Sequence, residues 1–183
     1  MLKQAEAPGI AYRLDYDNNI VGVHFPGSYG CAEDLEARRA VGTNLLWHVS
    51  GLATATYVKS MLDGARRGKR IKLPYRCDAP GRRRRWVMEA SLISGDGLLL
   101  THSLIEDRAL TSRLQFRAAD SFVQAIPRCS ICNQVFWGAG WEDLDENEES
   151  HVKGVVKDGG ILDVVYEICP SCRTLSQIDW MVS

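Results

Sequence analysis

The chain has 183 residues, of which 45% are hydrophobic and 25% are charged. These values are typical of globular proteins and exclude a disordered or fibrous chain. No run approaches 18 apolar residues, and Met1–Glu6 lacks the apolar core of a secretion signal. We therefore expect a cytoplasmic protein without a membrane span, built as one medium domain or as a small domain with an appended module.

The net charge of −1 conceals two regions of opposite sign. Residues 1–128 sum to +6, whereas residues 129–183 sum to −7. The cysteines change their pattern at the same place, because Cys31 and Cys77 stand alone while the four later ones form two C-x-x-C pairs. This division predicts two units that meet near residue 127.

Hydrophobic periodicity predicts two strands, two helices and a turn in the first part of the chain. Apolar and polar residues alternate over 10–16 and over 20–25, which favours two antiparallel strands. Residues 31–41 favour a short helix, and 52–67 a longer one with Ser50 as its N-cap. The apolar stripe of the longer helix is Ala55, Val58, Met61, Leu62 and Ala65.

Three further strands follow the helices. They are expected over 70–77, 85–93 and 98–105, and turn residues separate them. Residues 109–126 are expected to form a connector that is helical in part. The order of elements predicts an α+β fold with an antiparallel meander.

The two C-x-x-C pairs, Cys129/Cys132 and Cys169/Cys172, carry the strongest chemical signal. Two such pairs complete a tetrahedral four-sulfur site, which is typical of structural zinc. The intervening segment, 133–168, is longer than the roughly 15–20 residues of a compact ribbon, so an ordered excursion has to bring the pairs together. Redox dithiols and disulfides are the alternatives, less favoured without a thioredoxin-type context or a secretion signal.

Three motifs resemble a group of small bacterial PAS-like proteins. The run GTNLLWHVSG at 42–51 resembles the G-x-x-L-W-x-x-I-S-G entry to their central helix. The segment LPYRCDAP at 73–80, followed by four arginines, resembles their P-F-R-C-D-x-P-x-x-R-R hairpin. Members of the group also end in a C-x-x-C and an I-C-P-x-C segment, which 129–132 and 168–172 match.

The resemblance implies a PAS-like five-stranded antiparallel sheet with helices on one face over 8–108. It implies a zinc-ribbon-like module over 127–176, joined by the connector at 109–126. PAS domains hold small ligands between sheet and helices, dimerise and signal. The chain departs from the group at His48, where an acidic residue is frequent, and in the acidic segment 142–149, so the ligand and partner are not carried over.

A ligand pocket between the helices and the sheet is one candidate site. Its candidate residues are Trp47, Tyr57, Met61, Tyr75, Cys77, Met88, Leu100 and His102. Haem held by His102 with Cys77 or Met88 is conceivable, but no C-x-x-C-H attachment motif is present. The alternative that we favour is an ordinary core filled by side chains.

The basic cluster, ten Lys and Arg residues within 66–85, is the other candidate site. It ends in the run Arg82, Arg83, Arg84 and Arg85. A solvated hairpin edge is the first interpretation, and docking against the acidic segment 142–149 of the same chain or of a dimer mate is the second. Nucleic-acid binding ranks third, because only Tyr75 and Trp86 supply interleaved aromatic rings.

No nucleophile motif or glycine-rich phosphate loop indicates catalysis. We therefore predict a non-enzymatic sensory or regulatory protein that binds a small ligand or forms a homodimer, acts through an unidentified protein partner and contains structural zinc. One alternative is an interaction adaptor with a filled PAS core. The other is a nucleic-acid binder that uses the basic cluster of residues 66–85.

Overall fold

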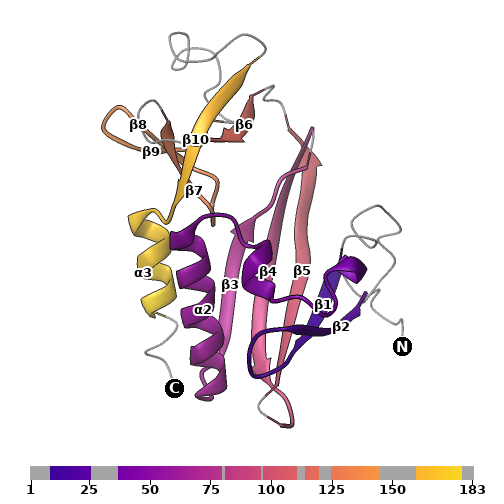
Figure 1. The fold of residues 1–183 in the computed structure, drawn as a ribbon. Coiled ribbons are helices and arrows are strands. Elements are labelled where there is room, and N and C mark those ends of the chain that lie inside the picture. The colour runs from indigo at the N-terminus through magenta and orange to yellow at the C-terminus, as the bar shows by residue number, and fades with distance from the viewer. Residues whose placement is uncertain are drawn as a thin grey trace, which may run out of the picture.

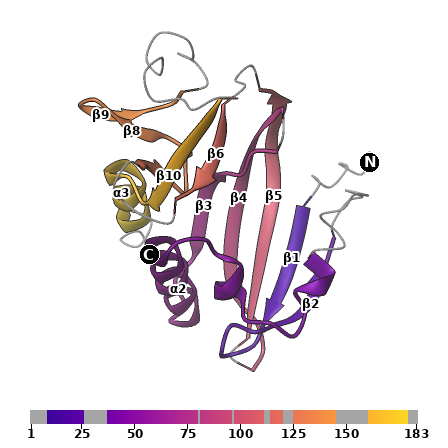
Figure 2. The same cartoon turned by 45° about the horizontal axis from the view of Figure 1, so that its top comes forward.

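Two five-stranded sheets and a long helix dominate the computed structural model (Figure 1). It describes residues 9–25, 37–79, 81–95, 97–110, 114–119, 125–144 and 160–178. In both views the second sheet lies near one end of the first, and helix α3 lies beside helix α2 (Figures 1 and 2). Within the described residues, no helix combines the length and the apolar character needed to cross a membrane.

The first sheet has the strand order β2-β1-β5-β4-β3, and every neighbouring pair is antiparallel. The N-terminal hairpin therefore joins the meander through β1 and β5, which are distant in the chain. This confirms the predicted antiparallel five-stranded sheet. The strands are β1 (Gly9–Leu14), β2 (Ile20–His24), β3 (Ile71–Arg76), β4 (Arg82–Leu92) and β5 (Leu98–Ala109).

Helix α2 (Leu52–Arg66) covers one face of the first sheet. Val58, Met61, Leu62 and Ala65 are buried as predicted, and Thr54 is buried in the first turn. The predicted N-cap at Ser50 is wrong, since Gly51 occupies that position with a φ of 83° and no side-chain cap. A short 3-10 helix, η1 (Leu45–His48), precedes α2. Of the helix expected over 31–41, residues 37–39 are helical and 31–36 lie outside the described residues.

The second sheet has the order β6-β10-β7-β8-β9. Its central strand β10 runs parallel to β6 and β7, whereas β8 is antiparallel to both β7 and β9. The elements are β6 (Gln115–Ala118), β7 (Ile126–Cys129), β8 (Val135–Trp137), β9 (Gly140–Glu142), β10 (Ile161–Glu167) and α3 (Pro170–Ile178).

The partly helical connector predicted at 109–126 is wrong where the structure describes it. Residues 115–118 form strand β6, whose backbone pairs with β10. Strand β4 also begins three residues earlier than predicted, at Arg82, and β5 continues to Ala109. At residues 115–118, pairing with a distant strand overrides the local helical preference. Sequence periodicity could not predict this, because it carries no information about which strands pair.

The main hydrophobic core extends from the first sheet into the cysteine region. Leu14, Leu62, Leu98 and Leu100 belong to the same buried cluster as Cys129, Ile131, Ile168, Cys169 and Cys172. A smaller cluster of Val135, Leu144, Leu162 and Val164 lies in the second sheet. The cysteine region is therefore packed against the first sheet.

Candidate metal centre

The parallel pairing of β7 with β10 brings the two C-x-x-C segments together. Cys129 ends β7 and lies opposite Glu167 near the end of β10, so Cys169 follows two residues later at the same edge. This pairing bridges the long interval in sequence. It is the ordered excursion that the spacing of the cysteines required.

The four cysteine sulfurs form a compact cluster. All four Sγ atoms lie within 4.8 Å of one another. The Sγ atoms of Cys132 and Cys169 are 3.8 Å apart. A tetrahedral ion with metal–sulfur bonds of about 2.3 Å has sulfur–sulfur edges of about 3.8 Å, so these positions fit a four-sulfur metal site closely. Cys129, Cys169 and Cys172 are buried, and Cys132 is partly exposed.

Backbone amides point at the sulfurs from the start of α3. The N–H of Cys169 donates to Sγ of Cys129, and the N–H of Cys172 donates to Sγ of Cys169, both at 3.4 Å. Asn133 adopts a φ of 64° and donates its N–H to the carbonyl of Cys129, which closes the turn over residues 129–133, here called the first knuckle. Amide donors and a helix N-terminus stabilise thiolates, the form in which cysteine binds metals.

Without a cation, Cys129 differs in pKa from Cys132 and Cys172. Hydrogen bonds from Cys132 and Cys172 lower the pKa of Cys129. The hydrogen bond to Cys129 raises the pKa of Cys132 to about 12, and that of Cys172 is raised by the same partner. Cys129 therefore favours the thiolate beside protonated Cys132 and Cys172, and four thiolates together need a bound cation.

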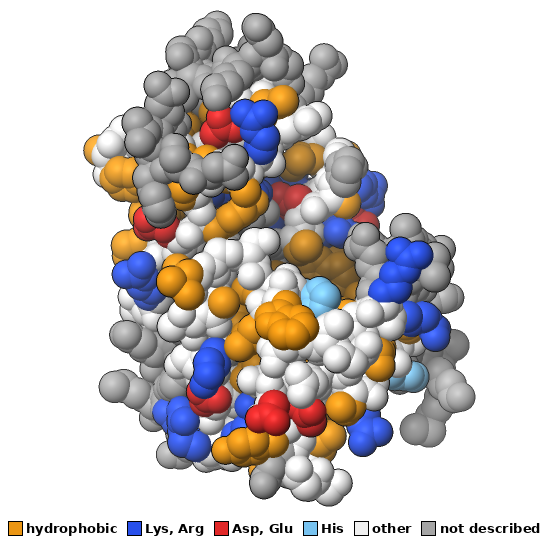
Figure 3. Space-filling model, viewed as in Figure 1, with side chains coloured by type: hydrophobic (Ala, Val, Ile, Leu, Met, Phe, Trp, Pro, Cys, Tyr) orange, Lys and Arg blue, Asp and Glu red, His pale blue; other side chains and the backbone are white. Residues whose placement is uncertain are grey.

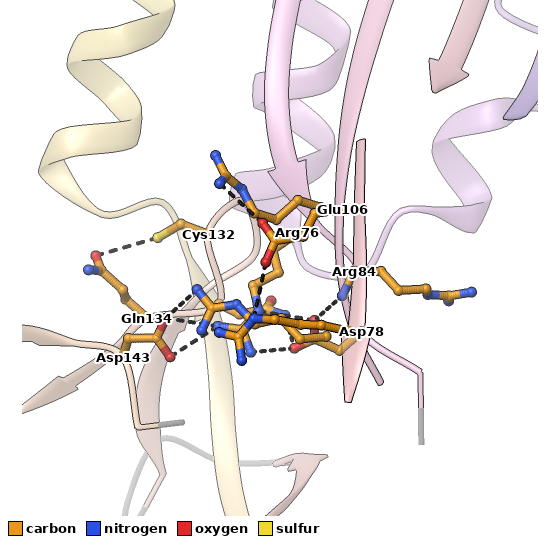
Figure 4. Close-up of polar contacts among 11 residues, drawn as sticks. Arg76, Asp78, Arg84, Glu106, Cys132, Gln134 and Asp143 are labelled. Carbon is orange, nitrogen blue, oxygen red and sulfur yellow. Dashed lines mark hydrogen bonds and ion pairs between the residues drawn. The ribbon is translucent and has the colours of Figure 1, made fainter. Parts of the chain in front are cut away.

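A buried arginine links the metal-site region to the first sheet. Arg76, at the end of β3, is only 7% exposed. Its guanidinium lies 2.7 Å from Oδ2 of Asp78 and 3.0 Å from both carboxylate oxygens of Asp143 (Figure 4). Arg83 contacts the same Asp143 at 2.9 Å. These ion pairs join the β3–β4 hairpin to the segment that follows β9.

Asp78 is charged at the centre of this network. Burial acts to raise its pKa, but hydrogen bonds from Arg76, from the N–H of Arg84 and from Asn133 outweigh burial and lower it. The pKa of Arg76 is raised despite its own burial, by its hydrogen bonds and charge attraction to Asp78 and Asp143. Both partners remain ionised, so the link is a true ion pair.

The first knuckle contacts three separate parts of the first sheet and its helix. Ser130 Oγ lies 2.5 Å from Thr54 Oγ1 on α2. The carbonyl of Ile131 accepts from the N–H of Arg76 on β3 at 2.7 Å. Asn133 Nδ2 donates to Asp78 in the β3–β4 turn at 3.0 Å. The position of the knuckle is therefore coupled to α2, to β3 and to the hairpin turn.

Five of the eight candidate pocket residues belong to the packed core or line it. A sixth, His102, lies beside them. Met61, Met88 and Leu100 are fully buried, and Tyr57 and Tyr75 pack against them. His102 is partly buried on the same face, with Nδ1 2.8 Å from the hydroxyl of Tyr75. Desolvation lowers the pKa of His102 to about 4, so its imidazole is neutral near pH 7.

Trp47 and Cys77 do not lie in that core, which corrects the predicted pocket. Trp47 is 80% exposed, because Leu45 is the residue that η1 buries. Cys77 is exposed, because β3 ends at Arg76 and its inward alternation stops there. Cys77 is therefore not placed to ligate a group in the core together with His102.

The arginines at the end of the basic cluster are paired within the chain. Arg82 contacts Asp107 at 2.8 Å, and Arg85 contacts Glu106 at 3.3 Å. Arg84 donates to the carbonyl of Cys77 and lies over the ring of Trp86. Arg83 of this run contacts the acidic segment, through Asp143, whereas these acidic partners of Arg82 and Arg85 lie on the neighbouring strand β5. These ion pairs within the chain disfavour an open anion-binding surface. Residues 145–149 of the acidic segment lie outside the described residues.

Comparisons with known proteins give no relative from which to transfer a role. No family model, no curated protein and no solved structure matches the chain. Any function assigned to it therefore rests on the site itself.

Sequence reasoning found the four cysteines but missed Asp78 and Asn133. The R-C-D sequence at 76–78 was available as a signal, since an adjacent acid and base of this kind suit an ion pair. Asn133 gave a weaker one, because asparagine after a C-x-x-C readily adopts a positive φ. Neither pattern indicates the contact between Asp78 and Asn133, which joins the β3–β4 hairpin to the segment between β7 and β8.

Proposed function

We propose that this chain is a PAS-like regulatory protein whose C-terminal module is held by structural zinc. The spatial order β2-β1-β5-β4-β3, with α2 on one face, supports the PAS-like assignment. The four-sulfur cluster supports zinc, which favours tetrahedral thiolate sites. A reducing cytoplasm suits such a site, because its thiols persist there.

The observation that carries this proposal is the fit of four clustered sulfurs to one tetrahedral ion. Cys129, Cys132, Cys169 and Cys172 would hold the zinc and fill all its positions. The ion would supply positive charge that balances four thiolates and would fix the two knuckles. With no position left for water or substrate, we assign the site a structural and non-enzymatic role.

We propose that the PAS-like part binds another protein or a second copy of this chain. Met61, Met88 and Leu100 are buried in the interior, in the region of the candidate ligand pocket, which supports the filled core favoured from the sequence. Trp47 and Leu52, by contrast, are 80% and 86% exposed on either side of the start of α2. Apolar side chains also reach the surface on the face in Figure 3. Exposed tryptophan is characteristic of residues that anchor protein interfaces, which favours a homodimer or another protein partner.

Small-ligand binding is the second candidate, favoured by one cluster of polar aromatic groups. His102 packs edge-to-face against Tyr12 and Tyr75, with centroids 5.7 and 5.6 Å away. These groups offer oriented hydrogen bonds beside an apolar core, as ligand sites do. A ligand would have to displace packed side chains there.

Native mass spectrometry of the freshly reduced protein, with metal analysis of the same sample, tests both candidates. We expect about one zinc per chain, no further retained small molecule, and a dimer mass. The Cys172→Ser variant should lose the metal, whereas Cys77→Ser should keep it. A metal-free wild-type sample would contradict the zinc site, and a retained organic molecule would move ligand binding to first place.

A further inference from the structure

Cys132 differs from the other three cysteines of the cluster in its access to solvent. Cys129, Cys169 and Cys172 are 0%, 0% and 4% exposed, while Cys132 is partly exposed. We infer that Cys132 is the entry point of a peroxide-sensitive switch, in which a Cys132–Cys169 disulfide expels the metal and releases the first knuckle from the first sheet. This inference rests on the metal site proposed above.

Cys169 provides a resolving sulfur within reach of Cys132. Its Sγ lies 3.8 Å from that of Cys132, so a small rotation of either side chain brings the two into bonding distance. Cys169 is itself fully buried, so an oxidant in solution reaches Cys132 first. An exposed thiolate beside a buried second thiolate is the arrangement that converts a sulfenic acid into a disulfide.

The reaction balances with hydrogen peroxide as the oxidant. The Cys132 thiolate attacks one peroxide oxygen, the O–O bond breaks, and hydroxide leaves with Cys132 as the sulfenic acid. The Cys169 thiolate then attacks the Cys132 sulfur, an S–S bond forms and a second hydroxide leaves. Two thiolates lose two electrons in total, and peroxide is reduced to two hydroxides. Cys129 and Cys172 remain as two ligands, too few to hold the ion tightly.

The released knuckle has direct contacts through which the change reaches the first sheet. Ile131 accepts the backbone hydrogen bond of Arg76, and Asn133 donates to Asp78. Ser130 contacts Thr54 on α2. All three knuckle residues lie within one or two positions of Cys132, so a shift of its sulfur moves their backbone. Oxidation therefore loosens the β3–β4 hairpin and the start of α2 together.

The test treats the reduced, metal-containing full chain with hydrogen peroxide. A chromogenic chelator follows metal release, and peptide mapping identifies the disulfide. Hydrogen exchange reports the amide of Arg76, which the Ile131 carbonyl protects. We expect release of about one equivalent of metal, a Cys132–Cys169 disulfide, and about tenfold faster exchange at Arg76, all reversed by a thiol reductant with added zinc.

Two variants separate this switch from general oxidation damage. Cys132→His should keep the metal, because three cysteines and one histidine also form structural zinc sites, but it should resist peroxide release at least about tenfold better. Cys77→Ser removes an exposed thiol outside the cluster and should respond like wild type.

Each result has a separate meaning. A reduced wild type without metal contradicts the proposed metal site itself. Metal that is bound but retained under peroxide overturns the switch and leaves the metal site standing. A Cys129–Cys132 disulfide, or unchanged exchange at Arg76 after release, also overturns it.

Discussion

Arg76 is a buried side chain that links the two parts of the molecule. Its guanidinium is removed from water and shared between two carboxylates, one in its own hairpin and one after β9. A buried charge is tolerated only while its partners are present, because desolvation of an unpaired ion costs several kcal/mol. The R-C-D sequence at 76–78 is thus explained by structure, without a ligand.

Replacing Asp78 with alanine should destabilise the protein by about 1–3 kcal/mol. The change leaves Arg76, the N–H of Arg84 and Asn133 without an acceptor that each now uses. Urea unfolding at pH 7 measures the loss. Asp107→Ala is the matched control, since it breaks an exposed pair with Arg82 and should have little effect. Equal losses in the two variants would show that the buried network contributes nothing special.

His102 should make stability depend on pH in a defined window. Its pKa is about 4 in the folded chain and about 6.5 when unfolded, so the unfolded state binds a proton more readily. The free energy of unfolding that neutral His102 contributes is fully present above pH 6.5. It is lost as the pH falls from 6.5 to 4, by up to about 3 kcal/mol. Denaturant titrations at several pH values measure this slope.

The His102→Asn variant provides the comparison for that slope. Asparagine does not titrate, so its unfolding free energy should vary less with pH between 6.5 and 4 than that of wild type. Protons also compete for the cysteine sulfurs, and the difference between the two proteins at each pH removes that shared effect. Parallel curves would contradict a buried neutral histidine.

Among the elements, helix α2 connects both parts of the main core. Its buried face packs against the first sheet, and its first turn touches the knuckle through Thr54. Gly51 fits closely there, because an added Cβ would lie 3.1 Å from the Cβ of Tyr166 on β10. The helix is therefore fixed at its start by the second sheet and along its length by the first.

Leu62→Ala should cost about 2–5 kcal/mol, since Leu62 is 0% exposed and its removal leaves a cavity. Leu52→Ala on the same helix is the control at low protein concentration, where the monomer leaves that side chain 86% exposed and its loss should change stability little. Thermal or urea unfolding compares them. If Leu52 instead proved costly in a concentrated sample, its burial in an oligomer would be indicated.

The sequence predicted elements well where one face of a segment is buried. Alternation identified β1, β2 and the meander, and the 3.6-residue period identified α2. Strand β6 at 115–118 was not predicted, because a four-residue edge strand is too short to show a clear alternation and depends on β10 for its pairing. Cys77 was misplaced because the alternation of β3 was extended past its end at Arg76, and Trp47 was misplaced because η1 buries Leu45 in its stead.

For the site, the cysteine spacing predicted the cluster of four sulfurs, while the contacts around it could not be predicted. Four cysteines in two C-x-x-C pairs serve few chemical roles, so a metal site can be predicted from the sequence alone. The partner of Asp78, in contrast, lies 55 residues away in Asn133. Nothing local in either segment specifies that contact, which arises only when both sheets have formed.

Over the whole molecule, the shared core predicts that metal loss weakens the first sheet as well as the second. Leu14, Leu62 and Leu98 pack in one cluster with Cys129 and Cys169. A strong zinc chelator should therefore lower the midpoint of thermal unfolding by about 10 °C or more, in a single transition. Calorimetry tests this, with hydrogen exchange in β4 as a second probe. An unchanged high-temperature transition after metal removal would show that the first sheet is independent.

The central position of β10 also affects how the chain folds as it is synthesised. Strands β6 and β7 both pair in parallel with β10, yet both precede it by more than 30 residues. A nascent chain that has not yet reached residue 161 holds one cysteine pair and two strands that await their partner. The N-terminal sheet, whose strands all lie before residue 110, can form earlier on the ribosome. Capture of a metal by all four cysteines therefore has to wait until Cys172 has been synthesised, and until β10 is made the edges of β6 and β7 that pair with it stay open.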